Sequence, residues 1–520
     1  MALFKEYSYK QGAAISVGST FIWKLLSFVN SILIAFYFGT QARADIYFYI
    51  VQMAGVAAVF FTSLNGNVLI PQAMFLRKQN EQNARSFINF FLLLYGIFLI
   101  VILALGFLFP VNIFDLFSKF SQEILTKDIL ILQLAFLYFC SYVFCYFLLD
   151  IMYMYRIFSV NFLLPLNAVV PMIVLVLFHN NLGLKAMLCG FIISYILQAF
   201  IYFCLMKKKL NWAFTDFKTT FENRLKNNIL TNQILILANF CIGMLPMYLM
   251  SSFAGGVISA YSYAKQLTDA PSEILTSKIT SVFHIQLNEN AAAQNFEDLN
   301  RNYLKANYLI LFIMVPLAIF TCYFAPDIVN LFFKRGEFNA QSSTNVVKFL
   351  RPMMILLITT VLTPFAVSLI ASTRKIKESF KYMIFRDIVI ICAMYFFITR
   401  FGPFAYPYTQ LGCSIFGYFI VALFFKNHIP QIKFWQPLKD TAFLVFLNLL
   451  ALIPSAFLAQ MLVGQAVFIR IFICGLLFLF TLALLYLPTG QLKKILTFVL
   501  GTRYQNFCAK LPRPLKKFFI

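Results

Sequence analysis

Long apolar runs alternate with short polar connections from residue 14 to residue 488. Fourteen runs are long enough to cross a bilayer, since about 20 helical residues span its hydrocarbon core of about 30 Å. The pattern therefore predicts an all-α polytopic membrane protein with about 14 transmembrane helices. The predicted spans are residues 14–38, 46–70, 87–109, 129–153, 158–178, 182–206, 229–253, 256–284, 306–325, 346–371, 380–398, 404–425, 441–463 and 466–488.

Polar residues in the first span follow a helical period. Lys24 lies near its middle, where a lysine costs at least about 3 kcal/mol on insertion scales. Steps of three and four residues from Lys24 place five polar side chains on one helix face. These are Ser16, Thr20, Lys24, Ser27 and Ser31, with Asn30 at the edge. This polar stripe extends over most of the thickness of the membrane.

The eighth span carries a second polar stripe at the same spacing. It consists of Ser262, Gln266, Asp269, Glu273, Thr276 and Thr280, with Lys265 beside it. Pro271 is expected to kink this helix. Two such stripes facing each other would line a water-filled cleft. The alternatives are that the hydroxyls pack against neighbouring helices or bond to the backbone, and that Lys24 forms a structural ion pair with Asp269 or Glu273.

The first six spans and the next six look like copies of each other. "FGTQARADIYFYIVQ", which begins at Phe38, corresponds to "FAGGVISAYSYAKQL", which begins at Phe253, and further pairs keep a separation of about 215–223 residues. Since six is an even number, both copies keep the same orientation, and a pseudo-two-fold axis along the membrane normal is predicted. The expected organisation is an N-lobe, a C-lobe, two extra helices and a basic tail, over residues 1–210, 211–430, 431–490 and 491–520.

The charge distribution predicts the orientation in the membrane. The chain has a net charge of +23, and 12% of its residues are charged, against roughly 25% in soluble proteins. Most Lys and Arg residues lie in loops and tails on one side. The loops on the other side hold Arg43, Lys119, Lys127, Lys334, Arg335 and Arg400. By the positive-inside rule both termini are cytoplasmic, and the basic segments contact lipid headgroups rather than nucleic acid.

Motifs for other classes of protein are missing from the sequence. It contains no GxxxxGK[ST] loop for ATP, no HExxH and no nucleophile elbow, and its ten cysteines are scattered without a CxxC. No ion-selectivity filter is recognisable. These observations argue against an enzyme or a channel and favour a secondary transporter with a cavity between two lobes.

Three segments resemble one family of transporters. "FGTQARADIYFYIVQ", "GVISAYSYAKQLTDAPSEILTSKITSVFHIQL" and "LFFKRGEFNAQSS" resemble the MurJ/MviN family of flippases for lipid-linked peptidoglycan precursors, which belongs to the multidrug/oligosaccharidyl-lipid/polysaccharide exporter superfamily. The resemblance implies a bacterial inner-membrane protein of cell-wall biogenesis that works by alternating access. It also implies a cationic central cavity and a groove, formed by the last two helices, for a polyprenyl tail.

The sequence departs from the family pattern at several cationic positions. Lys24 keeps the charge of an arginine in the family's first helix, whereas Asn30 replaces a second arginine. The second span has no cation, and Gln266 takes an arginine position beside Lys265. Asp45 and Asp269 match acidic positions of the family. The resemblance further suggests a sodium site, for which the candidates are Asn239 and Asp387.

The residues predict a transporter, and the resemblance implies that it is a flippase for an undecaprenyl-pyrophosphate-linked saccharide, lipid II or a related envelope precursor. It is expected to be a monomer without a bound cofactor and to use the membrane potential or a Na⁺ or H⁺ gradient. The predicted cavity residues are Lys24, Ser27, Asn30, Ser31, Asp45, Lys265, Gln266, Asp269, Glu273 and Arg386. For Arg386, the simpler interpretation is that it forms a local ion pair with Asp387. The rival functions are a cation-coupled multidrug exporter with an acidic cavity and a non-transporting scaffold of envelope assembly.

Overall fold

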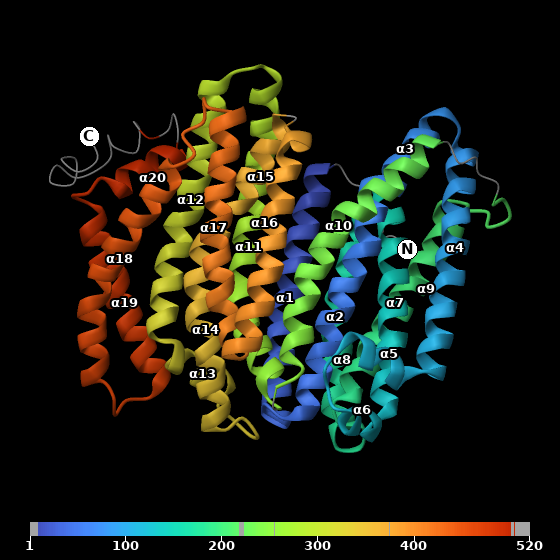
Figure 1. Cartoon of the computed structure of the whole chain (residues 1–520), viewed down its shortest axis with the longest axis horizontal. Coiled ribbons are helices and arrows are strands. Elements are labelled where there is room, and N and C mark those ends of the chain that lie inside the picture. The colour runs from blue at the N-terminus through green and yellow to red at the C-terminus, as the bar shows by residue number, and fades with distance from the viewer. Residues whose placement is uncertain (1–8, 218–222, 254, 374, 501–503, 505–520) are drawn as a thin grey trace. The chain divides into compact units, whose positions relative to one another are not determined.

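A computed structural model describes residues 9–217, 223–253, 255–373, 375–500 and 504, and these form helices joined by short loops (Figure 1). The helices are α1 (Tyr9–Phe38), α2 (Ala42–Leu64), the π-helical η1 (Asn65–Leu69), α3 (Ile70–Gln79), α4 (Glu81–Leu108), α5 (Pro110–Phe117), α6 (Gln122–Lys127), α7 (Ile129–Met154), the 3₁₀-helical η2 (Phe158–Leu163), α8 (Leu166–Leu182), α9 (Lys185–Lys209), α10 (Asn223–Met250), α11 (Val257–Ala292), α12 (Phe296–Tyr323), α13 (Ala325–Phe333), α14 (Ala340–Thr360), α15 (Thr363–Ser372), α16 (Ile376–Phe401), α17 (Ala405–His428), α18 (Gln436–Met461), α19 (Val467–Tyr486) and α20 (Gln491–Leu500).

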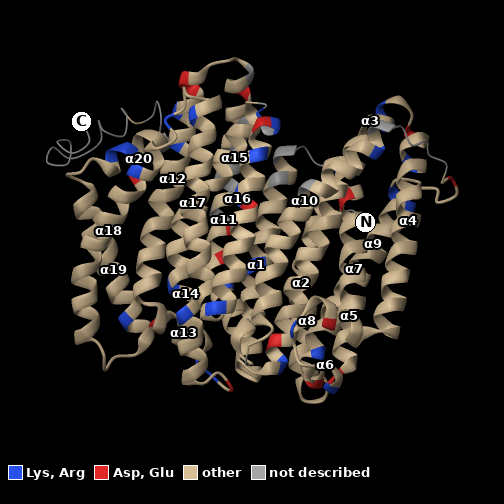
Figure 2. Cartoon of the chain, in the orientation of Figure 1, with Lys and Arg blue, Asp and Glu red and all other residues tan. Residues whose placement is uncertain are grey.

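The predicted class of fold is confirmed. Thirteen segments of the described chain are long and apolar enough to cross a membrane. Helix α11 is not among them, but it occupies the eighth predicted span and carries the charged residues of the second polar stripe. Charged side chains are sparse along the middle of the helices and more frequent at their ends (Figure 2). The chain is therefore an all-α, multi-pass membrane protein with about 14 transmembrane helices.

Asparagine side chains define where several helices begin. Asn80 accepts a hydrogen bond from the Gln82 amide (2.8 Å) ahead of α4. Asn339 accepts one from the Ser342 amide (2.8 Å) ahead of α14. Each bond satisfies an amide in the first turn that has no partner within the helix. Polar residues between the apolar runs therefore fix the ends of the helices, while the runs themselves supply the surface that faces lipid.

The helices form two compact units. The first consists of residues 1–259 and 335–338, and the second of residues 260–334 and 339–520. In the first unit α9 packs against α7 and α8, and α2 packs against α7 and α10. In the second unit α12 packs against α14 and α18, and α16 packs against α17.

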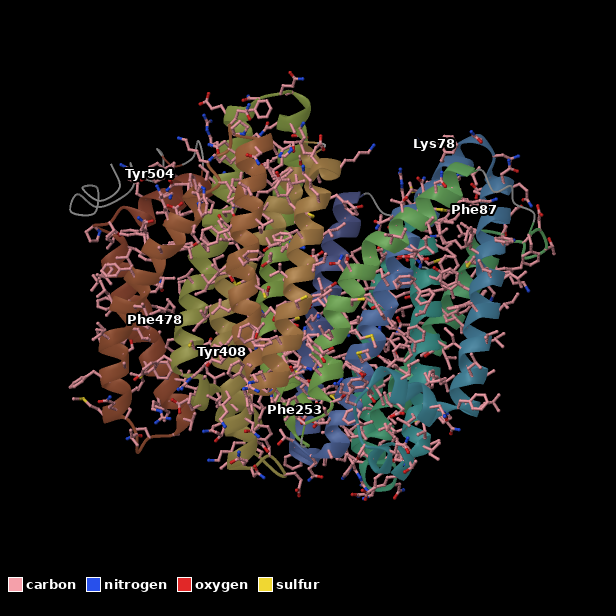
Figure 3. All side chains as sticks on the ribbon, in the orientation of Figure 1. Lys78, Phe87, Phe253, Tyr408, Phe478 and Tyr504 are labelled. Carbon is pink, nitrogen blue, oxygen red and sulfur yellow. The ribbon has the colours of Figure 1, made fainter. Side chains whose placement is uncertain are left out.

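Within the second unit, the last two membrane helices pack on α12 and α13. α18 and α19 form a hairpin in which Asn448 donates a hydrogen bond to the hydroxyl of Tyr486 (2.8 Å). Phe478, labelled in Figure 3, packs on Phe320 of α12 with ring centroids 5.4 Å apart. Arg470 of α19 also forms an ion pair with Asp327 of α13. These contacts attach the hairpin firmly to α12 and α13.

Candidate functional site

Lys24 lies on α1, and its half-buried side chain places the ammonium group 5.0 Å from the centroid of the Trp23 ring. A cation over an aromatic face is attracted by the negative face of the ring. Among the other members of the stripe, Ser27 is half-buried as well. The exposed apolar side chains of α1 include Phe21 and Leu25, which lie outside the stripe. The polar stripe is therefore separate from the exposed apolar face of this helix.

Ser31 and Asn30 are both buried within the first unit. The Ser31 hydroxyl donates to the carbonyl oxygen of Ser27 (3.3 Å) on its own helix. The Asn30 amide group donates to the carbonyl oxygen of Ala168 (3.0 Å) on α8. The structure thus places Asn30 at the contact between α1 and α8, where its hydrogen bond joins the two helices.

Asp45, near the start of α2, caps the N-terminus of α11. Its carboxylate is 3% exposed and accepts hydrogen bonds from the amides of Gly256 (2.6 Å) and Ser259 (2.7 Å). The amides at the start of a helix have no helical partners, and the helix dipole favours a negative charge there. The carboxylate therefore joins two helix starts that are more than 200 residues apart in the sequence.

The "KRGEF" loop lies against the end of α1. The Glu337 amide donates to the carbonyl oxygen of Phe36 (2.9 Å). Gly336 has φ +59°, and a Cβ atom at this position would lie 2.2 Å from the same Phe36 oxygen. Gly256 has φ +97°, and its Cβ would lie 2.6 Å from the carbonyl oxygen of Thr40. Glycine is required at both positions because a side chain has no room there and the backbone is left-handed.

Helix α11 carries the polar residues predicted for the second stripe. Lys265 forms an ion pair with Asp269 one turn further along, and both side chains are more than one third exposed. Gln266 is half-buried, and Glu273 is exposed. The Thr280 side chain lies outside the described residues. Lys24 belongs to the first unit and Asp269 to the second, so a pairing of these two residues stays a prediction.

Arg386 and Asp387 form a local ion pair on α16. Both Nε and Nη2 of the arginine donate to one carboxylate oxygen, at 2.9 and 2.7 Å. The aspartate is buried and the arginine side chain is 23% exposed. This geometry agrees with the simpler interpretation, which is that Arg386 and Asp387 form a local ion pair.

The suggested sodium site draws on both units. Asn239 is exposed on α10 of the first unit, and Asp387 is buried on α16 of the second. Their joint role stays a prediction. Among the described residues, no group of three or more His, Cys, Asp or Glu side chains is arranged to hold a metal ion.

A buried polar network in the first unit was not predicted. The hydroxyl of Tyr95 donates to the side-chain oxygen of Asn65 (2.7 Å), whose amide group donates to Asp150 (3.2 Å). Asn65 begins the π-helical segment η1, which joins α2 to α3 in one continuous span longer than predicted. π-Helical turns of this kind are frequent at functional sites. Three polar residues in three separate apolar runs were the available signal, but sequence spacing alone does not show that they meet.

Comparison with known proteins identifies what the chain resembles as a whole. Residues 34–483 match the model of the family described as lipid II flippase MurJ. A probable lipid II flippase MurJ from Borreliella burgdorferi is 23% identical over 424 residues, which cover 78% of this chain and 81% of that protein.

Solved structures show the same fold. A lipid II flippase MurJ in an inward closed conformation superposes with a TM-score of 0.71 at 17% identity, covering 91% of this chain and 99% of that one. An inward-facing multidrug resistance MATE family transporter of the MOP superfamily gives a TM-score of 0.63 at 15% identity, covering 78% and 95%. At these identities the likeness concerns the fold alone, which this chain shares with both of these transporters.

Proposed function

The chain belongs to the lipid II flippase MurJ family, and from this premise we propose that it moves an undecaprenyl-pyrophosphate-linked saccharide from the inner to the outer leaflet. The observation that carries the proposal is the family match over residues 34–483, which includes the C-terminal end of α1 from Ile34, all of α11 and the KRGEF loop. The substrate is lipid II or a related envelope precursor, and transport proceeds by alternating access.

Cationic side chains within the membrane would bind the pyrophosphate. Lys24 on α1 and Lys265 on α11 offer compact point charges, which attract phosphate without the paired hydrogen bonds of arginine. Lys265 is bound to Asp269, so an incoming pyrophosphate has to compete with this carboxylate. Arg386 is held in the same way by Asp387. We infer that exchange of a carboxylate for a phosphate at Lys265 accompanies loading of the substrate.

The α18–α19 hairpin would hold the polyprenyl tail. Ile453 and Phe457 on α18 and Phe472 and Phe480 on α19 are each more than half exposed. A long hydrocarbon tail requires an apolar surface that lies beside the lipid, and this hairpin provides one. The tail would thus remain in the bilayer while the saccharide passes through the protein.

The membrane potential would drive the movement. A potential that is negative inside favours the outward transfer of negative charge by about 2.3 kcal/mol per charge and 100 mV. A Na⁺ or H⁺ gradient is the second proposed source, with Asn239 and Asp387 as candidate ligands. In this proposal the protein acts as a monomer in the cytoplasmic membrane, with both termini in the cytoplasm.

A reconstitution experiment tests the substrate. The full chain is placed in vesicles with lipid II confined to one leaflet, and a membrane-impermeant reagent measures the arrival of the saccharide on the other leaflet. We expect arrival above the rate of protein-free vesicles and acceleration by a potential of the correct sign. Translocation no faster than in protein-free vesicles, with the protein shown to be folded, would contradict the proposal.

The likeness to multidrug transporters supports a second candidate function, the export of cationic drugs. Asp269 and the exposed Glu273 are the acidic groups that a cationic drug would require. In the same vesicles, a cationic dye replaces lipid II and an ion gradient replaces the potential. Gradient-dependent movement of the dye without movement of lipid II would favour the exporter, and movement of neither would favour the scaffold.

A further inference from the structure

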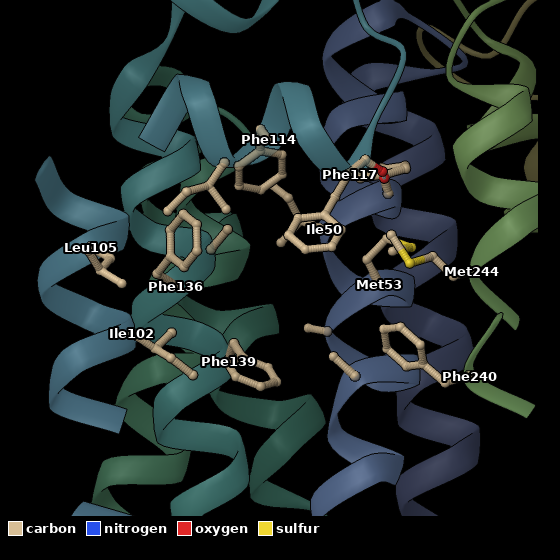
Figure 4. A pocket seen from close by; sticks show the side chains of 15 residues that line it. Ile50, Met53, Ile102, Leu105, Phe114, Phe117, Phe136, Phe139, Phe240 and Met244 are labelled. Atoms are coloured by element: carbon tan, nitrogen blue, oxygen red, sulfur yellow. The ribbon is translucent and has the colours of Figure 1, made fainter. Parts of the chain in front are cut away.

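The first unit contains an apolar cavity of about 380 Å³ between α2, α4, α5, α7 and α10 (Figure 4). Its walls are side chains such as Ile50, Phe114, Phe136 and Phe139, and Phe240 contributes from α10. The volume lies within the range of about 300–1,000 Å³ that is typical of ligand sites. The cavity is therefore large enough for a ligand, and its apolar lining favours an apolar ligand.

The wall of the cavity has almost no polar group that could form a hydrogen bond with a polar ligand. Tyr49 is the one lining residue with a polar side-chain group, and its hydroxyl donates to the carbonyl oxygen of Phe117. The Tyr49 ring also packs edge-on against Phe120, with centroids 5.2 Å apart. A ligand in this cavity therefore has to be a hydrocarbon along its buried length, because buried polar groups need partners.

The length of the cavity fits within one leaflet of a bilayer. Its lining on α2 extends from Tyr49 to Ala57, which corresponds to about 12 Å at 1.5 Å per residue. This length is somewhat less than half of the hydrocarbon thickness of about 30 Å. Leu105 on α4 is 46% exposed and Phe117 on α5 is 42% exposed, so the wall includes side chains that reach the lipid-facing surface. A chain from a neighbouring lipid would enter there.

A cation lies just beyond the α5 end of the cavity. Lys119 follows the lining residue Phe117 by two positions, and its ammonium group lies 5.2 Å from the centroid of the Tyr248 ring. Tyr248 is one helical turn beyond Met244, which also lines the cavity. The Lys119 amide donates to the Ser251 hydroxyl (2.7 Å), which holds this segment in place.

We propose that this cavity binds one acyl chain of an anionic phospholipid from the surrounding bilayer, with the phosphate group beside Lys119. The positive charge at one end and the apolar wall along the rest complement such a lipid. The site goes beyond the proposed function, because this lipid is bound and not transported. A polyprenyl tail is far longer than the cavity, so the transported substrate is not its occupant.

Photo-cross-linking in vesicles tests the site. The probes are phosphatidylglycerol with a diazirine in one acyl chain and phosphatidylcholine with the same chain. We expect phosphatidylglycerol to label α2 and α7 peptides several-fold more than phosphatidylcholine. Ala57→Trp fills the cavity and should reduce this labelling about tenfold. Lys119→Gln should reduce the labelling by phosphatidylglycerol to the level of phosphatidylcholine.

Val59→Trp provides the matched control, since it adds the same ring to the same helix at a position that is 51% exposed and outside the lining. It should keep the labelling of the unmodified chain. If Ala57→Trp does not fold, Ala135→Phe fills the cavity from α7 instead. Equal labelling of the filled variant and the control, or of the unmodified chain by the two probes, would overturn the proposal. Displacement of the label by undecaprenyl phosphate would assign the cavity to the polyprenyl tail and overturn it too.

Discussion

A lysine inside a membrane span must be compensated, and Lys24 has an aromatic ring beside it. The ammonium lies 5.0 Å from the Trp23 ring centroid, and the side chain remains partly exposed. A ring stabilises the charge by about 0.5–2 kcal/mol, which is less than the insertion cost of at least about 3 kcal/mol. The ring therefore offsets only part of this cost, and an anionic ligand bound at Lys24 would reduce it further.

Substitution of Lys24 separates a role in binding from a role in folding. Lys24→Arg keeps the charge and should transport at nearly the unmodified rate. Lys24→Gln removes a charge-assisted contact of about 1.5–3 kcal/mol, so transport of lipid II at low concentration should fall roughly tenfold or more. Rates in the vesicle assay and the amount of folded protein in the membrane are both measured.

Lys348→Gln is the matched control for this measurement. The Lys348 ammonium also lies 5.0 Å from an aromatic centroid, that of Phe404, but outside the proposed site. Normal transport by Lys24→Gln would show that Lys24 does not bind the substrate. Failure of Lys24→Gln to accumulate in the membrane would indicate a structural ion pair instead.

At the scale of the helices, sequence periodicity predicts the helices and the contacts within each of them, but it does not predict contacts between helices. Each of the fourteen predicted spans contains a helix, because long apolar runs permit little else in a membrane. The short helices α5 and α13 lie in connections that the sequence left unassigned. The cap on α11 was missed for a different reason: Asp45 matched an acidic position of the family, but spacing does not show which helix it contacts.

The candidate site was predictable to a similar degree. Lys265 and Asp269 are one turn apart, so helical periodicity places them together, and the structure shows them paired. The network of Asn65, Tyr95 and Asp150 joins three helices and has no local signature. Interactions within one helix follow from spacing, whereas interactions between helices depend on how the helices pack.

The contact between the KRGEF loop and α1 gives a prediction at this scale. Gly336→Ala places a Cβ 2.2 Å from the Phe36 carbonyl oxygen at φ +59°. The left-handed backbone alone costs an alanine about 1–2 kcal/mol, and the clash adds to this cost because it forces the loop away from α1. We expect a clearly lower midpoint of thermal unfolding in detergent.

Gly490→Ala isolates the effect of the clash. Gly490 also has a positive φ, +71°, but no atom lies within 4 Å of its Cβ position. It should lose only the stability that the backbone conformation costs, so its unfolding midpoint should lie between those of Gly336→Ala and the unmodified chain. Equal midpoints for the two variants would show that the loop is not held by this contact.

At the scale of the whole molecule, the distribution of basic residues predicts which loops face the cytoplasm. In a chain from which the native cysteines have been removed, single cysteines are placed at Lys208, Lys377, Lys127 and Arg400. All four positions are exposed, so burial does not limit their reaction with a maleimide. An impermeant maleimide applied to intact spheroplasts should label the cysteines at Lys127 and Arg400.

The other two positions should react only after the membrane is permeabilised. Lys208 lies in a cluster of three lysines at the end of α9, and Lys377 lies near the start of α16. Positively charged loops are retained on the cytoplasmic side during insertion, which is the physical basis of the assignment. Labelling at Lys208 or Lys377 from outside would invert the topology. The membrane potential would still favour outward movement of the negatively charged pyrophosphate, because that energy depends on the charge and the potential and not on the orientation of the chain. Such labelling would therefore overturn the assigned orientation and leave the proposed driving force unchanged.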